Sequence, residues 1–217
     1  MEEQIEEKEV KIFKEILEWC FCIFLALIIA LVTRYYIFTS TMVKQTSMYP
    51  TLKENQRVLL SRTKRITNGQ YKRGDIITFE APSEVKKGID VDLSNKVAIY
   101  NYEPESVMEK LAYYVLELTK MSYIKRVIAV EGDRVQIANG KVYLNGEELI
   151  EEYLPEGTTT KIVYYNDVVV PEGCVFVMGD NRDESMDSRT FGCIPLEKVE
   201  GKVLLRYWPI TQFGTVK

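Results

Sequence analysis

The longest apolar stretch of the chain lies near its start. Residues 19–33 (WCFCIFLALIIALVT) contain no charged side chain. As a helix they would rise about 22 Å, which is short of a bilayer core of about 30 Å. Extending the stretch to residues 16–38 places Glu18 and Arg34 near the two interfaces, where an arginine can snorkel. We therefore predict one transmembrane helix over this range, preceded by an acidic tail over residues 1–15.

A buried core helix and a cleavable signal peptide contain similar apolar runs. The segment before this run has seven Glu against three Lys, whereas a signal peptide begins with positive charge, and no Ala-x-Ala-like cleavage site follows. The pattern favours a membrane span. Its orientation stays open, because basic residues flank both ends and the positive-inside rule does not choose between them.

From Thr39 onward, short runs typical of β-strands are separated by turns. The runs are RVLLS (57–61), DIITFE (75–80), YIKRVIAV (123–130), DRVQI (133–137), KVYL (141–144), KIVYY (161–165), DVVV (167–170) and CVFVMG (174–179). Asn139-Gly140 and Asn145-Gly146 lie between or beside such runs, and Asn-Gly is a strong hairpin signal. Hairpins are predicted over residues 133–150. We predict a mainly β domain over residues 39–217.

One segment of this domain has a different period. Between Pro104 and Met121 the apolar residues recur at helical spacing, at positions 107, 111, 115 and 118. A helix is predicted there, packed against the sheet, within an insertion over about residues 82–121. Its polar face carries both Glu and Lys rather than a basic stripe, which makes a membrane-surface or partner-binding helix the less favoured alternative.

Composition fits one globular domain with one appended element. The 217 residues are 46% hydrophobic and 28% charged, which is ordinary for a globular protein. A net charge of −4 without a basic block argues against nucleic acid as a partner.

The four cysteines fall into two pairs. Cys20 and Cys22 lie in the apolar run and are interpreted as small hydrophobic side chains. Cys174 and Cys193 flank the loop GDNRDESMDSR, and spacing alone leaves open whether they form a disulfide or stay free.

The chain has no histidine, which restricts its chemistry. Ser47, in the turn sequence QTSMYPTL, is a candidate nucleophile, and without histidine its base has to be another group, such as a lysine that burial keeps neutral. Lys125 fits, since its neighbours are mostly apolar and a strand would place it on one face with Tyr123 and Val127. Taken singly, an edge-strand lysine and a turn serine are the ordinary interpretations.

Taken together, four ordered motifs resemble the bacterial type I signal peptidases, which are membrane-bound Ser-Lys proteases. The motifs are Ser47-Met48-Tyr49-Pro50-Thr51-Leu52, Arg73-Gly74-Asp75-Ile76 with Phe79, Tyr123-Ile124-Lys125-Arg126-Val127-Ile128 with Gly132-Asp133, and Gly179-Asp180-Asn181-Arg182 with Ser185, Asp187, Ser188 and Arg189. The resemblance covers the apolar span and nearly the whole β domain.

The resemblance implies a role for each matched residue. Ser47 would be the nucleophile, Lys125 the general base, and Ser185 the residue that hydrogen-bonds and orients Lys125. The resemblance also implies two further sets: Met48, Tyr123 and Ile124 would line the substrate pockets, and Arg126, Asp180, Asp187 and Arg189 would hold the frame of the site.

The implied activity is removal of signal peptides from exported preproteins after small residues at positions −1 and −3. The chain would be a single-pass protein of the cell membrane with its catalytic domain on the extracytoplasmic face. Its partners would be preprotein signal peptides and the lipid bilayer, with contact to the export machinery left open. Neither a cofactor nor a metal is implied, and with no histidine and only distant cysteines the acidic residues near Asp180 support zinc or iron poorly.

Three features depart from the family pattern. Glu131 stands where the family usually has Pro. Gln45 replaces the Ser or Gly often found two residues before the nucleophile, which leaves open the side-chain contribution to the oxyanion hole. The connection over residues 82–121 is longer than usual. Two alternatives stay open: a Ser-Lys processing peptidase with a narrow substrate, and a catalytically silent, membrane-anchored module that binds peptides.

Overall fold

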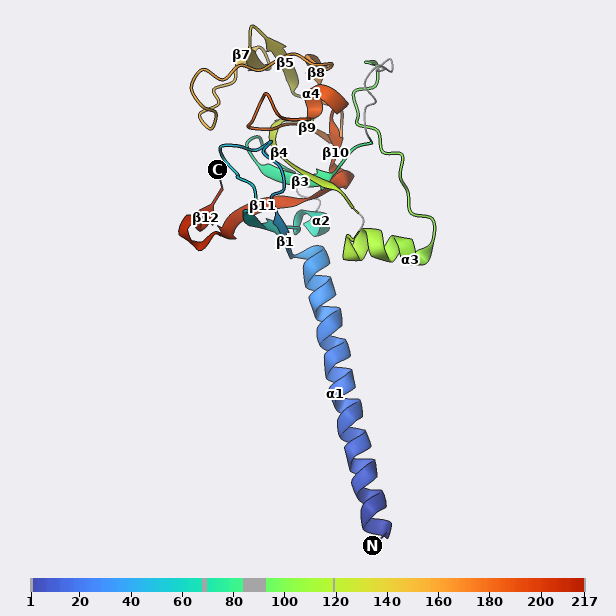
Figure 1. Ribbon diagram of the computed structural model, residues 1–217. Helices are drawn as coiled ribbons and strands as arrows, with labels where there is room; N and C mark the ends of the chain where they lie inside the picture. Colours follow the sequence, from blue (N-terminus) through green and yellow to red (C-terminus); the bar gives the residue numbers. More distant parts are fainter. Residues whose placement is uncertain (1, 68–69, 84–92, 119, 217) are drawn as a thin grey trace.

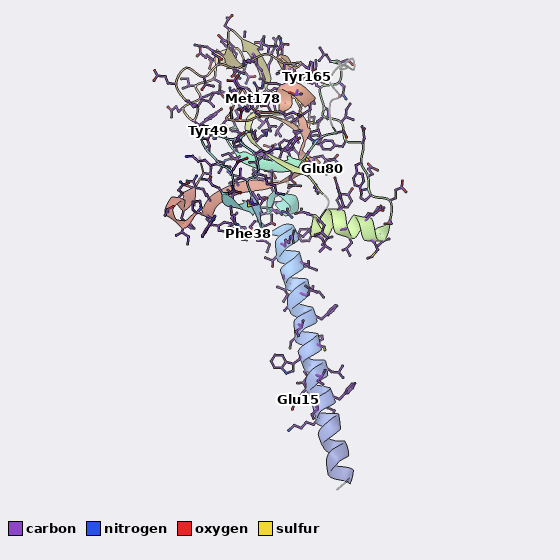
Figure 2. The ribbon with its side chains drawn as sticks, viewed as in Figure 1. Glu15, Phe38, Tyr49, Glu80, Tyr165 and Met178 are labelled. Atoms are coloured by element: carbon purple, nitrogen blue, oxygen red, sulfur yellow. The ribbon has the colours of Figure 1, made fainter. Side chains whose placement is uncertain are left out.

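A long N-terminal helix leads into a β-rich domain (Figure 1). The computed structural model describes residues 2–67, 70–83, 93–118 and 120–216. Helix α1 spans Glu2–Tyr36, so the predicted acidic tail is continuous with the helix. Within α1, the stretch Lys11–Tyr36 is long and apolar enough to cross a membrane, and none of its most apolar window is buried. Figure 2 places Phe38 where this helix meets the domain.

The large sheet carries most of the domain. In the described part of the chain it has eight strands in the order β1-β2-β11-β3-β4-β9-β10, with β12 paired to β11. Its strands are β1 (Phe38–Met42), β2 (Arg57–Ser61), β3 (Ile76–Glu80), β4 (Ser122–Val130), β9 (Cys174–Met178), β10 (Ile194–Pro195), β11 (Val199–Trp208) and β12 (Gly214–Thr215). All of these pairings are antiparallel, which suits a sheet with one face open to solvent.

A smaller sheet lies at the end of the domain far from α1 (Figure 1). Its strands, in the order β7-β6-β5-β8, are β5 (Arg134–Ala138), β6 (Lys141–Leu144), β7 (Glu147–Glu148) and β8 (Asp167–Val169). The predicted hairpins are confirmed. Asn139 and Gly140 both have positive φ, at 53° and 75°, as a two-residue turn that matches the strand twist requires.

The short helices lie between strands. They are α2 (Lys64–Thr67), α3 (Val107–Lys110), the π-helix η1 (Leu111–Leu116), α4 (Ser188–Phe191), and the 3₁₀ turns η2 (Leu196–Lys198) and η3 (Ile210–Gln212). Helix α3 begins at Ser106, whose side chain accepts from the Glu109 N–H while the Glu109 carboxylate reaches back to the cap, as in a capping box.

Two strand predictions need correction. The run KIVYY over 161–165 forms no strand. The N–H groups of Tyr164 and Tyr165 instead both donate to the Arg189 carbonyl, and no neighbouring strand pairs with them in the described structure. The longest strand of the domain, β11, was not among the predicted runs.

The predicted packing of the inserted helix is also wrong. A helix forms within the expected range, as α3 continued by η1, but Val107, Leu111 and Leu118 are exposed and Tyr113 is its buried apolar residue. The helix lies beside the C-terminal end of α1 (Figure 1), and it reaches the sheet through Tyr113, whose hydroxyl donates to Glu80 on β3. Residues 84–92 of the predicted insertion lie outside the described residues.

Both cysteines of the second pair are buried free thiols. Cys174 lies on β9, and Cys193 directly precedes β10, which pairs with β9. Burial raises the pKa of the Cys193 thiol to about 12, and it also raises the pKa of the Cys174 thiol. The structure therefore has no disulfide at this place.

Apolar side chains of β4, β5 and β9 form a core where the two sheets meet. Phe176 on β9 is 0% exposed in this cluster and packs with Ile128 and Val135. A second cluster around Phe79 and a third around Met48 and Leu52 lie closer to α1.

We expect Phe176→Ala to lower the free energy of unfolding by about 3–5 kcal/mol, because it leaves a cavity where the two sheets join. Phe213→Ala, at a side chain that is 65% exposed, is the matched control and should change stability by less than about 0.5 kcal/mol. Urea unfolding of both full-length variants in detergent measures the difference. Equal stabilities would contradict the assignment of this core.

Candidate active site

Ser47 lies in a tight turn after β1. The Tyr49 N–H donates to the Thr46 carbonyl at 2.9 Å, and the Leu52 N–H donates to the Met48 carbonyl at 2.8 Å. Met48 and Leu52 are buried and anchor the turn in the core. Ser47 itself is also buried. The sequence SMYPTL therefore presents one hydroxyl from a loop that its apolar neighbours hold in place.

Lys125 comes from the middle of β4, a strand that pairs with β3 on one side and β9 on the other. Its Nζ donates to Ser47 Oγ at 2.7 Å. The side chain is 1% exposed. The two residues that the sequence identified as nucleophile and base are thus 78 positions apart in the chain and in direct contact.

Burial changes the chemistry of this lysine. Desolvation lowers the pKa of Lys125 from its ordinary value of 10.5 to about 8, with Asp187 and Asp180 opposing that shift and Arg189 supporting it. A sizeable fraction of the amine is therefore neutral slightly above neutral pH. A neutral amine beside a hydroxyl can accept its proton.

Arg126 and Asp180 hold one side of the site. Arg126 follows Lys125 on β4, so its side chain points to the opposite face. Its Nε and Nη2 donate to the two Asp180 oxygens at 2.9 Å and 2.7 Å, and Thr51 Oγ1 donates to the same carboxylate at 2.5 Å. This bidentate pair joins the lysine strand, the loop after β9 and the nucleophile turn.

Asp187 and Arg189 hold the other side. Arg189 donates from Nε and Nη2 to the Asp187 carboxylate at 2.8 Å and 2.9 Å, and both residues are buried. Asp187 also accepts from the Gly179 N–H at 3.0 Å, and Arg189 donates to the Arg182 carbonyl at 2.8 Å. The structure thus brings all four predicted frame residues to the site.

Ser185 lies in the site but does not make its predicted contact. Its hydroxyl is buried and has no hydrogen-bond partner among the described residues, so the expected hydrogen bond to Lys125 is not made. The Lys125 amine points at Ser47 instead, and Ser185 packs against Gly179. A Cβ at Gly179 would clash with the Ser185 side chain and the Ser47 carbonyl.

A cleft of about 370 Å³ opens beside Ser47. Its lining includes β1, the nucleophile turn and the end of the insertion, with Thr39, Ser40, Thr41, Met42, Ser47, Met48, Ile124, Arg62, Glu117 and Lys120 among its residues. Two of the predicted pocket residues, Met48 and Ile124, line it. Tyr123 is not in the described lining. Its ring packs against Phe79, and the ring centroid lies 5.2 Å from Lys125 Nζ.

Sequence reasoning missed the charged end of this cleft. Arg62 Nη2 pairs with Glu117 at 2.7 Å, and Lys120 Nζ lies 3.1 Å from Glu200 and 3.5 Å from Glu80. Glu117 and Lys120 belong to the insertion, and Glu117 has a positive φ of 54°. No short motif joins these residues, because they come from four separate segments.

The described residues contain no group of three or more Cys, Asp or Glu side chains arranged to hold a metal ion. The acidic residues near Asp180 are used as arginine and lysine partners, since Asp183 pairs with Lys161 at 2.6 Å.

Comparison with known proteins gives consistent similarities. Residues 16–208 match the family described as signal peptidase, peptidase S26. The chain is 32% identical to the signal peptidase I of Bacillus licheniformis, covering 95% of this chain and 96% of the relative. It is 31% identical to the signal peptidase IB of Staphylococcus aureus strain COL, covering 92% and 93%. A crystal structure of a signal peptidase I from Enterococcus faecalis V583 is 26% identical, with a TM-score of 0.37, over 62% of this chain and 97% of that chain.

The lowered pKa of Lys125 predicts how stability depends on pH. Between about pH 8 and 10.5 the unfolded chain binds a proton that the folded chain does not, so stability rises with pH in this window. Below about pH 8, Lys125 is protonated in both the folded and the unfolded chain, and burying its charge costs the folded state up to about 3 kcal/mol. We expect Lys125→Met to be more stable than the unsubstituted chain at neutral pH and to lose this advantage above pH 10.5.

Thermal unfolding of the full chain in detergent across this range measures the effect. Lys161→Met, at an exposed lysine, is the control and should follow the unsubstituted chain throughout. If the stability of Lys125→Met and that of the unsubstituted chain differ by the same amount at every pH, burial does not shift the pKa of Lys125.

Proposed function

The chain belongs to the signal peptidase, peptidase S26, family, and we propose that it removes signal peptides from exported preproteins as a membrane-anchored serine endopeptidase. The observation that carries this proposal is the 2.7 Å contact between Lys125 Nζ and Ser47 Oγ, inside a site where desolvation lowers the lysine pKa. In the absence of histidine, this pair supplies both the nucleophile and the base.

In the first half of the reaction, the neutral Lys125 amine takes the Ser47 proton as Ser47 Oγ attacks the scissile carbonyl. The tetrahedral intermediate collapses when Lys125 returns that proton to the leaving amine, which leaves an acyl-enzyme on Ser47. The Ser47 N–H donates to no acceptor among the described residues, so it can donate to the developing oxyanion.

In the second half, Lys125 accepts a proton from a water molecule as that water attacks the acyl-enzyme. When the tetrahedral intermediate collapses, Lys125 gives the proton to Ser47 Oγ, which restores the serine hydroxyl and the neutral amine and releases the carboxyl product. Once Ser47 is acylated, its hydroxyl is no longer a partner for Lys125. Ser185 provides a buried hydroxyl beside Gly179 that has no other partner among the described residues. We assign Ser185 the orienting role at this stage, as the third member of the site.

The cleft supports an extended substrate. Strand β1 lies at the edge of the large sheet and lines the cleft, so a peptide can add to it through main-chain hydrogen bonds. Alternate side chains of such a peptide face the same wall, which includes Met48 and Ile124. This arrangement fits small residues at positions −1 and −3.

The proposed topology follows from the same reaction. Helix α1 anchors the chain in the cell membrane as a single span, and the catalytic domain lies on the extracytoplasmic face, where the cleavage region of an exported preprotein emerges. The lipid bilayer and the signal peptide are the proposed partners, and contact with the export machinery is compatible with the position of the domain.

Two other functions would use the same fold. A processing peptidase with a narrow substrate would share the Ser47–Lys125 pair and differ in the cleft. A silent peptide-binding module would have no use for a serine hydroxyl in contact with a lysine of lowered pKa, so this contact counts against it.

We expect Ser47→Ala and Lys125→Ala each to lower cleavage of a preprotein with an Ala-x-Ala site by at least about 10²–10⁴-fold, because each removes a reacting group. Purified full-length protein in lipid or detergent is the sample, and Lys161→Ala is the matched control at an exposed lysine. Equal cleavage by all four proteins would exclude the dyad. Absence of cleavage by the folded unsubstituted chain would favour the narrow-substrate or silent alternative.

The pH dependence of cleavage tests the base directly. Lys125 has to be neutral, and its pKa is lowered to about 8, so kcat/KM should fall about tenfold for each pH unit below that value. The measurement uses a peptide without ionisable groups near its cleavage site. A rate that stays flat from mildly acidic to alkaline pH would contradict a lysine base.

A further inference from the structure

The insertion presents an apolar surface that the domain does not cover. Along α3, η1 and the residues after them, the exposed apolar side chains are Val107, Met108, Leu111, Tyr114, Leu118 and Met121. Val107 is 82% exposed, at the first position of the helix. Single apolar residues scattered over a surface are common and need no explanation. A group of them gathered along one short segment indicates an interaction site. We call these six residues the insertion face.

The helix that carries this face is firmly attached to the domain on its other side. The Tyr113 hydroxyl donates to Glu80 Oε1 at 2.7 Å, and Tyr113 is buried. The capping box at Ser106 fixes the start of the helix. The insertion face therefore stays exposed while its helix is held in place, rather than turning inward to pack.

Its position places the insertion face next to the candidate membrane span. Arg34, in the last turn of α1, donates from Nη2 to the Leu116 carbonyl at 3.0 Å. In Figure 1, α3 lies at the end of the domain nearest α1 and runs across the direction of that helix. A bilayer around Lys11–Tyr36 would reach its surface at about this level.

We propose that α3 and η1 form a second membrane contact, in which the insertion face enters the boundary between lipid headgroups and acyl chains beside α1. The helix lies in the plane of the bilayer surface, and Tyr114 and Tyr36, both exposed, lie where tyrosines are enriched at membrane interfaces.

A lipid surface fits this face better than an electrostatic partner does. The polar residues of the segment carry mixed charge and include Glu105, Glu109 and Lys110. An apolar contact with little net charge does not depend on anionic lipids or on salt. The segment that carries the insertion face also contacts α1, the candidate span, through the hydrogen bond from Arg34 to the Leu116 carbonyl.

The contact has a consequence for the cleft, which rests on the proposed function. Immediately after η1, Glu117 pairs with Arg62 and Lys120 pairs with Glu200, and all four residues line the same cleft as Ser47. A helix seated at the bilayer surface therefore fixes the wall of the cleft at a set height above the membrane. A substrate that enters from the bilayer meets Ser47 at that height.

Fluorescent labelling of the full-length chain in phosphatidylcholine vesicles tests the membrane contact without using activity. The background carries Cys20→Ala and Cys22→Ala, while Cys174 and Cys193 are buried. A single cysteine at Val107→Cys or Ile150→Cys receives an environment-sensitive dye. These positions are matched, since both side chains are 82% exposed, and Ile150 lies just after β7 of the small sheet, at the far end of the domain.

We expect the dye at position 107 to emit at shorter wavelength, to be quenched by lipids with a spin label on the upper acyl chain, and to resist quenching by iodide. The dye at position 150 should show the opposite response. Adding phosphatidylglycerol or salt should change neither result. Identical behaviour at the two positions would overturn the proposal, as would a dye at 107 that is shielded from iodide but not quenched by lipid, since that result indicates a protein occupant.

A second measurement tests the consequence for the cleft. Val107→Gln combined with Leu111→Gln should lower cleavage of a preprotein inserted in vesicles several-fold and leave cleavage of a short soluble peptide in detergent unchanged. Ile150→Gln is the control. An equal loss on both substrates would attribute the effect to damage of the site and overturn the positioning role. If the unsubstituted chain cleaves neither substrate, the proposed function is wrong, and the labelling experiment still decides whether the insertion face contacts the membrane.

Discussion

Lys125 is buried with a serine hydroxyl as its hydrogen-bond partner, while the carboxylates near it are already occupied. Asp180 is held by Arg126, and Asp187 is held by Arg189, each through two hydrogen bonds. A free carboxylate at either place would favour the charged lysine and restore its high pKa. The two arginines therefore support the proposed chemistry by pairing with Asp180 and Asp187. The motifs that carry these arginines meet one physical requirement, which is a lysine without a counter-ion.

The same requirement explains how closely three segments approach one another. The Asn181 N–H donates to the Ser47 carbonyl at 3.0 Å, and Gly179 leaves no room for a side chain between Ser47 and Ser185. The turn at Ser47, β4 and the loop after β9 meet around Lys125, which is 1% exposed. A glycine at this position is the condition for that contact.

Local signals in the sequence predicted the parts of the fold that depend on local physics. The Asn-Gly turns determine the hairpins. The apolar neighbours of Lys125 made it the candidate for a buried lysine, but taken alone they left an exposed edge-strand lysine as the ordinary interpretation. Strand β11 escaped prediction because its residues, interrupted by Gly201, are stabilised by distant pairing with β2 and β3. Helical periodicity located the inserted helix but could not say what covers its apolar face. The resemblance named the site residues, whereas the Arg62–Glu117 pair and the solitary Ser185 hydroxyl depend on tertiary contacts that no motif records.

Strand β1 starts two residues after α1 ends, and in the described part of the chain it forms the edge of the large sheet. Its five residues, Phe38–Met42, extend about 16 Å from the end of the helix toward the nucleophile turn. A peptide that added to this edge would have to cover the same distance in extended form before its scissile bond reached Ser47. If the proposed function holds, the length of β1 would set how many residues separate the membrane from the cleaved bond.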